Sequence, residues 1–296
     1  MRLRGQSEGA RAAVLALPPF LYAVLLLAVP LVAIVAISFM TQDGLVIDPT
    51  PSLANYREAL TSPIYIWGNA TRWGTLPVSL YVAAMVTLVT VVLAFPMAYF
   101  ISFYVAPSRK SLWLFLITIP FWTSYLVRIF LWKVVLGFNG VINTALMGLG
   151  LIREPLEALL YNLSSVIVAL SHSYVVFAIL PIYVALEKID RSLLEASQDL
   201  GETAFATFLR VTLPLAMPGV VGAVLIIFIP VIGDYVTPEL MLGAGGRLMS
   251  NLIQAQFLGL NNWPLGSALA IVTMIVVGVI ALLFLLLMRR WLRARG

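Results

Sequence analysis

Six long apolar segments divide the chain, and they constrain its fold more than any other feature. They lie at about 12–40, 76–105, 112–136, 164–186, 218–232 and 267–288. A helix that crosses the roughly 30 Å hydrocarbon core of a bilayer needs about 20 mainly apolar residues. Lipid offers the backbone no hydrogen-bond partner, so such segments must satisfy their own amides and carbonyls. The sequence therefore predicts an all-α, polytopic membrane protein with six transmembrane helices in one domain, residues 1–296.

Composition supports this class. Hydrophobic residues make up 61% of the chain and charged residues only 10%, against roughly 25% charged residues in an average soluble domain. The first segment follows a basic start, as a signal peptide would. Its apolar run is longer than the roughly 7–15 residues of a signal-peptide core, so we expect it to stay as the first helix.

The basic residues are distributed unevenly between the two sides. One side carries twelve, namely Arg2, Arg4, Arg11, Arg109, Lys110, Lys188, Arg191, Arg210, Arg289, Arg290, Arg293 and Arg295. The other carries four, Arg57, Arg72, Arg153 and Arg247, while Arg128 and Lys133 lie within the third segment. Because cytoplasmic loops are enriched in Lys and Arg, the sequence predicts that both termini are cytoplasmic.

Residue counts exclude several classes of function. There is no cysteine and only one histidine, so disulfide frameworks, thiolate metal sites and cysteine nucleophiles are excluded. The chain has no GxxxxGK[ST] run, which a phosphate-binding loop needs. No basic patch with a folded soluble module indicates nucleic-acid binding. We therefore expect a non-catalytic membrane subunit that binds no cofactor of its own.

A partly polar island, about 187–217, separates the fourth and fifth apolar segments on the cytoplasmic side. From Leu193 to Phe208, apolar or small residues recur every three to four positions among acidic ones, a spacing that places them on one helical face. Gly201 permits a sharp turn, and Pro214 and Pro218 indicate a break and the start of the next helix. The pattern predicts a short helix, a turn and a second short helix that suit the docking of a soluble partner.

The island resembles the EAA loop of the inner-membrane permeases of binding-protein-dependent ABC importers. The resemblance is carried by Glu195-Ala196-Ser197, Asp199-Leu200-Gly201, Leu213-Pro214 and Pro218-Gly219, with Ser197 where the family usually has alanine. In that family the loop docks on a cytoplasmic ATPase. The resemblance thus implies a type I ABC importer permease fold, with ATPase coupling by Glu195, Ala196, Asp199, Leu200, Gly201, Leu213 and Pro214.

Other stretches are similar to the spermidine/putrescine, or polyamine-type, group of these permeases. They are residues 120–128, residues 137–143 and residues 233–238. This resemblance implies a bacterial inner-membrane subunit that forms half of a translocation path for a small organic solute such as spermidine or putrescine. It further implies a second homologous permease subunit, two copies of an ATPase that binds ATP and Mg²⁺, and a periplasmic solute-binding protein.

For the substrate path we expect helix ends and polar groups inside the bundle. The candidates are Trp122, Ser124, Tyr125, Arg128, Asp234, Tyr235 and Glu239. Aromatic rings stack on organic cations, and carboxylates pair with ammonium groups. Arg128 opposes a cationic substrate, so either it pairs with an acid or the substrate carries an anionic group. His172, between two serines, is expected to be a hydrogen-bonded packing residue rather than a proton relay.

Three alternative functions compete with this interpretation, and the sequence offers less support for the last two. The same importer architecture serves opines, aminophosphonates or amino-acid-like solutes in related permeases, and these fit the sequence as well. An ion-coupled secondary transporter would show inverted repeats with broken helices, and no internal repeat is visible. A membrane enzyme would need a catalytic constellation around His172, and none is present.

Overall fold

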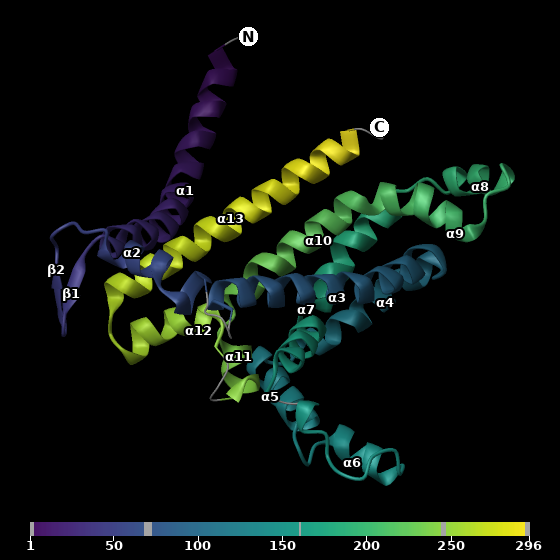
Figure 1. Ribbon diagram of the computed structural model, residues 1–296. Helices are drawn as coiled ribbons and strands as arrows, with labels where there is room; N and C mark the ends of the chain where they lie inside the picture. Colours follow the sequence, from purple (N-terminus) through teal and green to yellow (C-terminus); the bar gives the residue numbers. More distant parts are fainter. Residues whose placement is uncertain (1–2, 68–72, 160, 244–246, 294–296) are drawn as a thin grey trace. The chain divides into compact units, whose positions relative to one another are not determined.

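The computed structural model describes residues 3–67, 73–159, 161–243 and 247–293, which are mainly helical (Figure 1). The long helices are α1 Leu3–Ser38, α3 Thr75–Phe103, α7 Leu163–Glu187, α10 Leu213–Gly233 and α13 Trp263–Arg293. The shorter α-helices are α2 Ala54–Thr61, α4 Pro107–Thr118, α5 Tyr125–Leu136, α6 Val141–Gly148, α8 Arg191–Asp199, α9 Ala204–Thr207, α11 Val236–Met241 and α12 Met249–Gln254. Turns of 3-10 or π type are η1 Pro63–Trp67, η2 Ile119–Trp122, η3 Glu157–Leu159, η4 Phe208–Thr212 and η6 Ala255–Gly259.

The predicted all-α class with six spans is confirmed, apart from one small hairpin. Within the described residues, six helical stretches are long and apolar enough to cross a membrane. They are Val14–Ser38, Thr75–Phe103, Tyr125–Gly148, Leu163–Glu187, Ala204–Gly233 and Trp263–Arg290. Four of them agree with the expected segments to within four residues at each end, and the third and fifth do not.

The third segment is not one unbroken helix over 112–136, as the sequence predicts. Instead α4 tightens into the 3-10 turn η2, the chain is extended at Thr123 and Ser124, and α5 begins at Tyr125. Pro120 explains the interruption, because it has no amide hydrogen for the carbonyl of Leu116 and its ring crowds that carbonyl. The Ile119 amide bonds to the Leu116 carbonyl instead.

The fifth helix begins earlier than the expected residue 218. α10 starts at Leu213, with Pro214 in its first turn and Pro218 inside it. A proline is well tolerated in the first helical turn, where its missing amide hydrogen has no intrahelical acceptor. Pro218 lies one turn further on and removes only one backbone hydrogen bond, so the helix continues through it rather than starting there.

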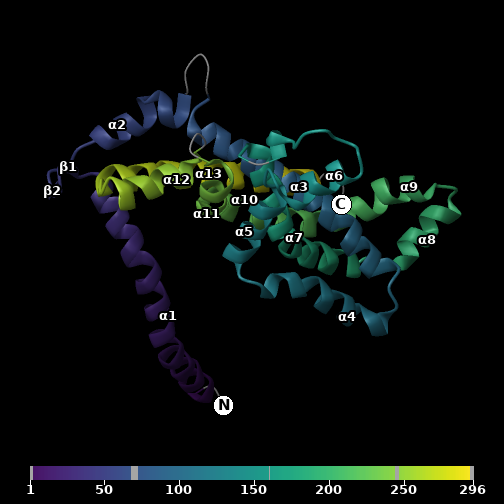
Figure 2. The ribbon, with the colours of Figure 1, turned by 90° about the horizontal axis from the view of Figure 1, so that it is seen from below.

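The chain divides into two compact units, of which the larger comprises Pro63–Leu252 and the chain from Ile275. Within it α3, α7 and α10 pack side by side (Figures 1 and 2). Their shared faces are rich in small buried residues, which let helix backbones approach closely in a membrane. These residues are Ala83, Ala94 and Ala98 on α3, Ala169 and Ala178 on α7, and Ala216, Gly219 and Ala223 on α10.

The smaller unit comprises the chain up to Ser62 together with Ile253–Met274. Its β1 strand, Thr41–Asp43, pairs antiparallel with β2, Val46–Asp48. Gln42 donates to the carbonyl of Asn261 at 2.6 Å, and its side-chain oxygen accepts from the amide of Trp263 at 3.2 Å. Asn55 of α2 donates to the carbonyls of Ser38 and Met40, which satisfies the end of α1.

The α7 and α10 helices approach each other closely at Gly219. A Cβ atom at this position would meet the carbonyl oxygen of Pro181 and come within 2.5 Å of the Ala185 Cβ atom. Gly222, one turn along the same helix, has room, because its Cβ would lie 3.8 Å from the Pro181 side chain.

We expect Gly219→Ala to destabilise the folded permease by about 1–3 kcal/mol, because an extra methyl group must push α7 and α10 apart. Gly222→Ala is the matched control and should leave stability nearly unchanged. The apparent melting temperature in detergent measures both. Equal melting temperatures for the two variants would contradict the close approach at Gly219.

Candidate functional site

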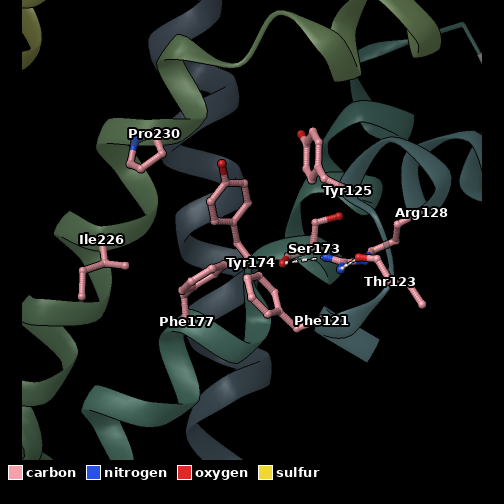
Figure 3. A pocket seen from close by; sticks show the side chains of 9 residues that line it. All are labelled: Phe121, Thr123, Tyr125, Arg128, Ser173, Tyr174, Phe177, Ile226 and Pro230. Atoms are coloured by element: carbon pink, nitrogen blue, oxygen red, sulfur yellow. Dashed lines mark hydrogen bonds between the residues drawn. The ribbon is translucent and has the colours of Figure 1, made fainter. Parts of the chain in front are cut away.

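A cavity of about 440 Å³ lies where the α4–α5 break meets α7 and α10 (Figure 3). It is lined by Phe121, Thr123, Tyr125, Arg128, Ser173, Tyr174, Phe177, Ile226 and Pro230. The ring centroids of Phe121 and Phe177 lie 4.9 Å apart in a T-shaped pair, and those of Tyr174 and Phe177 lie 5.9 Å apart. The walls are therefore mainly aromatic, with polar groups concentrated near the break.

Arg128 satisfies the backbone that the helix break leaves open. Its Nη2 donates to the carbonyls of Pro120 at 2.9 Å and Thr123 at 3.1 Å, and its Nη1 donates to the Ser173 carbonyl at 3.4 Å. The guanidinium also lies 5.8 Å from the Phe121 ring centroid. A cation is favoured at a helix C-terminus, where unpaired carbonyls carry partial negative charge. Arg128 is only 7% exposed, and no acidic partner is found for it within the described residues.

Asp234 lies at the end of α10 and connects this helix to α5 and α11. Its Oδ2 accepts from the Tyr125 hydroxyl at 2.7 Å, and its Oδ1 accepts from the Val236 amide at 3.1 Å. The Tyr125 hydroxyl also lies 2.6 Å from the Thr237 hydroxyl. Because a tyrosine has one hydrogen to donate and gives it to Asp234, Thr237 must donate to Tyr125. The hydrogen-bond donors to this carboxylate are thus neutral groups.

The structure brings together only some of the path residues that the sequence predicts. Tyr125 and Arg128 line the cavity, and Asp234 is bonded to Tyr125. The other four do not line it. Trp122 is 78% exposed, Ser124 precedes α5 without a side-chain capping bond, Tyr235 is exposed, and Glu239 accepts from Asn251 at 3.1 Å.

Seven lining residues were not among the predicted path residues, namely Phe121, Thr123, Ser173, Tyr174, Phe177, Ile226 and Pro230. Part of the signal is visible in the sequence. Ser173, Tyr174 and Phe177 are spaced so that they share one face of α7, and Ile226 and Pro230 are four residues apart on α10. Which face turns toward the break depends on the packing of three helices, and the spacing alone does not reveal it.

His172 has the hydrogen-bonded role that the sequence predicts. Its Nδ1 accepts from Trp132 Nε1 at 3.1 Å, and the two rings form a T-shaped pair with centroids 5.4 Å apart. Since an indole nitrogen can only donate, the Nδ1 of His172 carries no proton. The contact joins α5 to α7.

The island between α7 and α10 forms the predicted helix–turn–helix, with α8 and α9 (Figure 1). Asp190 caps α8 by accepting from the Ser192 amide at 3.0 Å. This backbone hydrogen bond lowers the pKa of the Asp190 carboxyl below its ordinary value. The cap is therefore intact at neutral pH and is lost as the pH falls through the lowered folded-state pKa.

Gly201 ends α8 in a left-handed conformation, with φ of +86°. The Gly201 amide donates to the Gln198 carbonyl at 2.8 Å, and the Glu202 amide donates to the Ser197 carbonyl at 3.2 Å. These two bonds are the Schellman motif that a glycine at this position permits. Thr203 then caps α9 by accepting from the Ala206 amide, so the turn is tightly defined.

The outer surface of this hairpin combines acids with bare apolar side chains. Glu195, Ala196 and Asp199 are exposed, and Leu200 is 86% and Phe205 71% exposed. The inner side is anchored by Phe208, whose ring packs against Phe95 and Tyr99 of α3. Leu213 and Pro214 are not on this surface: Leu213 packs against the core, and both belong to the start of α10.

A comparison with protein families matches residues 90–294, more than half of the chain, to the binding-protein-dependent transport system inner membrane components. The chain belongs to this family. The permease is therefore a subunit of an ABC importer, a transport component rather than an enzyme, and a multi-pass protein of the bacterial inner membrane.

Individual relatives agree with this assignment. The permease is 36% identical, over 85% of each chain, to the spermidine/putrescine transport system permease protein PotB of Haemophilus influenzae. It is 35% identical to PotB of Escherichia coli K12, over 88% of this chain and 92% of that one. A bacterial alginate ABC transporter, crystallised with an alginate pentasaccharide-bound periplasmic protein, contains a chain with a TM-score of 0.69, 17% identity and 99% coverage of both chains. That likeness confirms the predicted type I importer permease fold.

Replacing Arg128 with Met should lower the stability of the permease by about 2 kcal/mol or more, because buried carbonyls lose their donors. Arg128→Lys should fall between wild type and Arg128→Met, since one ammonium group cannot reach all three carbonyls. The control is Lys133→Met on the same helix. Melting temperatures in detergent rank the variants, and an unchanged value for Arg128→Met would refute the bracing role.

Gly201→Val should strain the turn by about 1–2 kcal/mol, because a β-branched residue disfavours positive φ. Gly201→Asn should cost less, since asparagine tolerates this region, and no atom lies within 4 Å of the added Cβ. Hydrogen exchange of the Glu202 amide measures the opening of the turn. Equal exchange rates for the Val and Asn variants would argue against conformational strain.

Proposed function

We propose that this permease forms half of the path of an ATP-driven importer for a small organic polycation of the polyamine class, such as spermidine or putrescine. The observation that carries the proposal is the aromatic cavity beside Asp234. The names of the PotB relatives point to the same substrate class. A cation at Arg128 opposes a cationic substrate, but the Nη1 and Nη2 groups of Arg128 donate to backbone carbonyls.

Charge and aromatic surface suit an alkyl chain that carries ammonium groups. Rings such as Tyr174 and Phe177 would stack on a cation, at about 0.5–2 kcal/mol for each contact. Asp234 and Glu239 have no basic partner within the described residues, so an arriving ammonium group would be the first cation to pair with them. Three other predicted path residues lie outside the cavity, namely Trp122, Ser124 and Tyr235. In this proposal they contact the solute as it enters or leaves.

ATP hydrolysis belongs, in this proposal, to a separate chain. Of the two copies of an ABC ATPase, which hold ATP and Mg²⁺, one would dock on the α8–α9 hairpin in the cytoplasm, where both termini are also predicted to lie. Leu200 and Phe205 would enter a groove of the ATPase, and Glu195 and Asp199 would meet basic or amide groups at its rim. Because the groove moves when ATP binds, it would favour one of two permease states over the other.

Two further partners complete the importer. A second homologous permease subunit would form the other half of the path, and a periplasmic solute-binding protein would deliver the ligand. The permease itself would bind no cofactor and no nucleic acid. In this proposal residues 1–296 form one permease domain in the lipid bilayer. This domain supplies half of the path and the helices α7 and α10, which move with the hairpin.

A second candidate substrate is a zwitterion such as an aminophosphonate, an opine or an amino acid. One observation favours it: the Nε of Arg128 is buried without a hydrogen-bond partner beside the cavity. An anionic group on the solute would accept from this nitrogen. The two candidates differ in the charge they place near Arg128.

Uptake by proteoliposomes that contain both permeases, the ATPase and the binding protein tests the proposal. Labelled spermidine and labelled 2-aminoethylphosphonate are compared, with a hydrolysis-deficient ATPase as control. ATP-dependent uptake of spermidine alone supports the polycation. Uptake of the phosphonate alone contradicts it, and uptake that persists without ATP hydrolysis contradicts the importer mechanism.

Replacing Asp234 with Asn should raise the KM for spermidine uptake about tenfold, equivalent to about 1.4 kcal/mol. The amide keeps the size of the side chain and an acceptor for Tyr125 but removes the negative charge. Glu154→Gln, which neutralises an exposed acid in another loop, is the matched control. If Asp234→Asn and the control have the same KM, Asp234 does not attract the substrate.

A further inference from the structure

A second polar cluster lies where α7 ends and the α8–α9 hairpin begins. The Lys110 Nζ is 2.6 Å from Oε1 and 2.8 Å from Oε2 of Glu187. Ser102 Oγ donates to Glu187 Oε2 at 3.1 Å. The cluster thus joins the ends of α3, α4 and α7, and none of its members lines the cavity or belongs to the exposed surface of the hairpin.

The two charges of this pair are unequally buried. The Lys110 side chain is 9% exposed and the Glu187 side chain 41%. A buried cation without a partner is costly, whereas a half-exposed carboxylate keeps much of its hydration. Loss of the ion pair therefore costs the buried lysine more free energy than it costs the half-exposed glutamate. The neighbouring Arg109 is exposed and provides a natural comparison.

The same cluster holds the first residue of α8. Arg191 Nη2 donates to the Ser102 carbonyl at 3.2 Å, and its guanidinium lies 6.0 Å from the Phe103 ring centroid. The end of α3 therefore contacts both Glu187 and Arg191. A displacement of α8 must act on this cluster, and through Lys110 on the first turn of α4.

From Lys110 the chain leads directly to the cavity. Phe121 is eleven residues along α4 and η2 from Lys110, about 16 Å of helix, and Phe177 is ten residues back along α7 from Glu187, about 15 Å. The rings of Phe121 and Phe177 meet in the cavity wall, 4.9 Å apart. The two segments are thus joined at two levels, by an ion pair at the hairpin end and by an aromatic pair at the cavity.

We propose that Lys110 and Glu187 are positioning residues that transmit movement of the α8–α9 hairpin, through α4, to the break that forms one wall of the cavity. When the ATPase displaces the hairpin, α7 and α10 move because they are continuous with it. α4 is not continuous with the hairpin, and at the hairpin end the ion pair is the contact that holds it to α7. This inference rests on the proposed function and adds the route by which α4 follows.

The test uses the complete importer in proteoliposomes and measures labelled spermidine uptake together with ATP hydrolysis stimulated by the binding protein. Lys110→Met should lower the uptake per ATP hydrolysed at least about threefold, within the range of known coupling changes. The exchanged pair, Lys110→Glu with Glu187→Lys, should restore the ratio to within about twofold of wild type. Arg109→Met is the matched control and should leave the ratio unchanged.

A merely structural role gives a different result. In that case fewer complexes assemble, and uptake and hydrolysis fall in proportion. This result would overturn the proposal. An unchanged ratio of uptake to hydrolysis for Lys110→Met, or no recovery of the ratio in the exchanged pair, would overturn it as well. If Lys110→Met does not assemble, Lys110→Arg and Glu187→Asp, which keep both charges but change their reach, are tested by the same ratio.

Failure of the proposed substrate is distinguishable from failure of this inference. Wild-type proteoliposomes that take up 2-aminoethylphosphonate but not spermidine contradict the polycation. The ratio is then measured for Lys110→Met with the phosphonate, and a lowered ratio still supports the ion pair as the coupling route.

Discussion

The requirement that lipid imposes on the backbone underlies the whole structure. In hydrocarbon each free amide or carbonyl must find a partner within the protein, so an interruption in a helix has to be satisfied by specific side chains. Here Pro120 interrupts the third segment, and Arg128 donates to the carbonyls that become free. The cavity exists because the chain bends at this point, and the bend is stable because a buried guanidinium provides several donors in one plane.

The cavity is built from three separate helices, and each fixes part of its character. α7 and α10 supply aromatic and aliphatic side chains, and the glycine at position 219 lets the two helices approach closely. The α4–α5 break supplies Phe121 and Thr123, and α5 supplies the guanidinium of Arg128. Asp234 adds a negative charge and, through Tyr125 and the start of α11, connects the end of α10 to α5. A change in any of these contacts would alter both the shape and the electrostatics of the cavity.

The hairpin joins the end of α7 to the start of α10, and the cavity lies further along both helices, at Phe177 on α7 and Ile226 on α10. The Schellman turn at Gly201 and the cap at Asp190 make the hairpin a defined body rather than a loose loop, so force applied to it would reach α7 and α10. The ion pair of Lys110 and Glu187 adds α4 to this set.

The sequence alone determined the membrane class, the six spans and the hairpin, because these depend on local properties: run length, helical spacing, and the backbone freedom of glycine. The EAA pattern around Glu195 and Gly201 also indicated the family. Only the tertiary structure decided that the third segment is broken, that Arg128 is held by carbonyls, and that Trp122 and Glu239 lie outside the cavity. These features depend on which faces of α5, α7 and α10 meet, and side chains far apart in the chain decide that jointly.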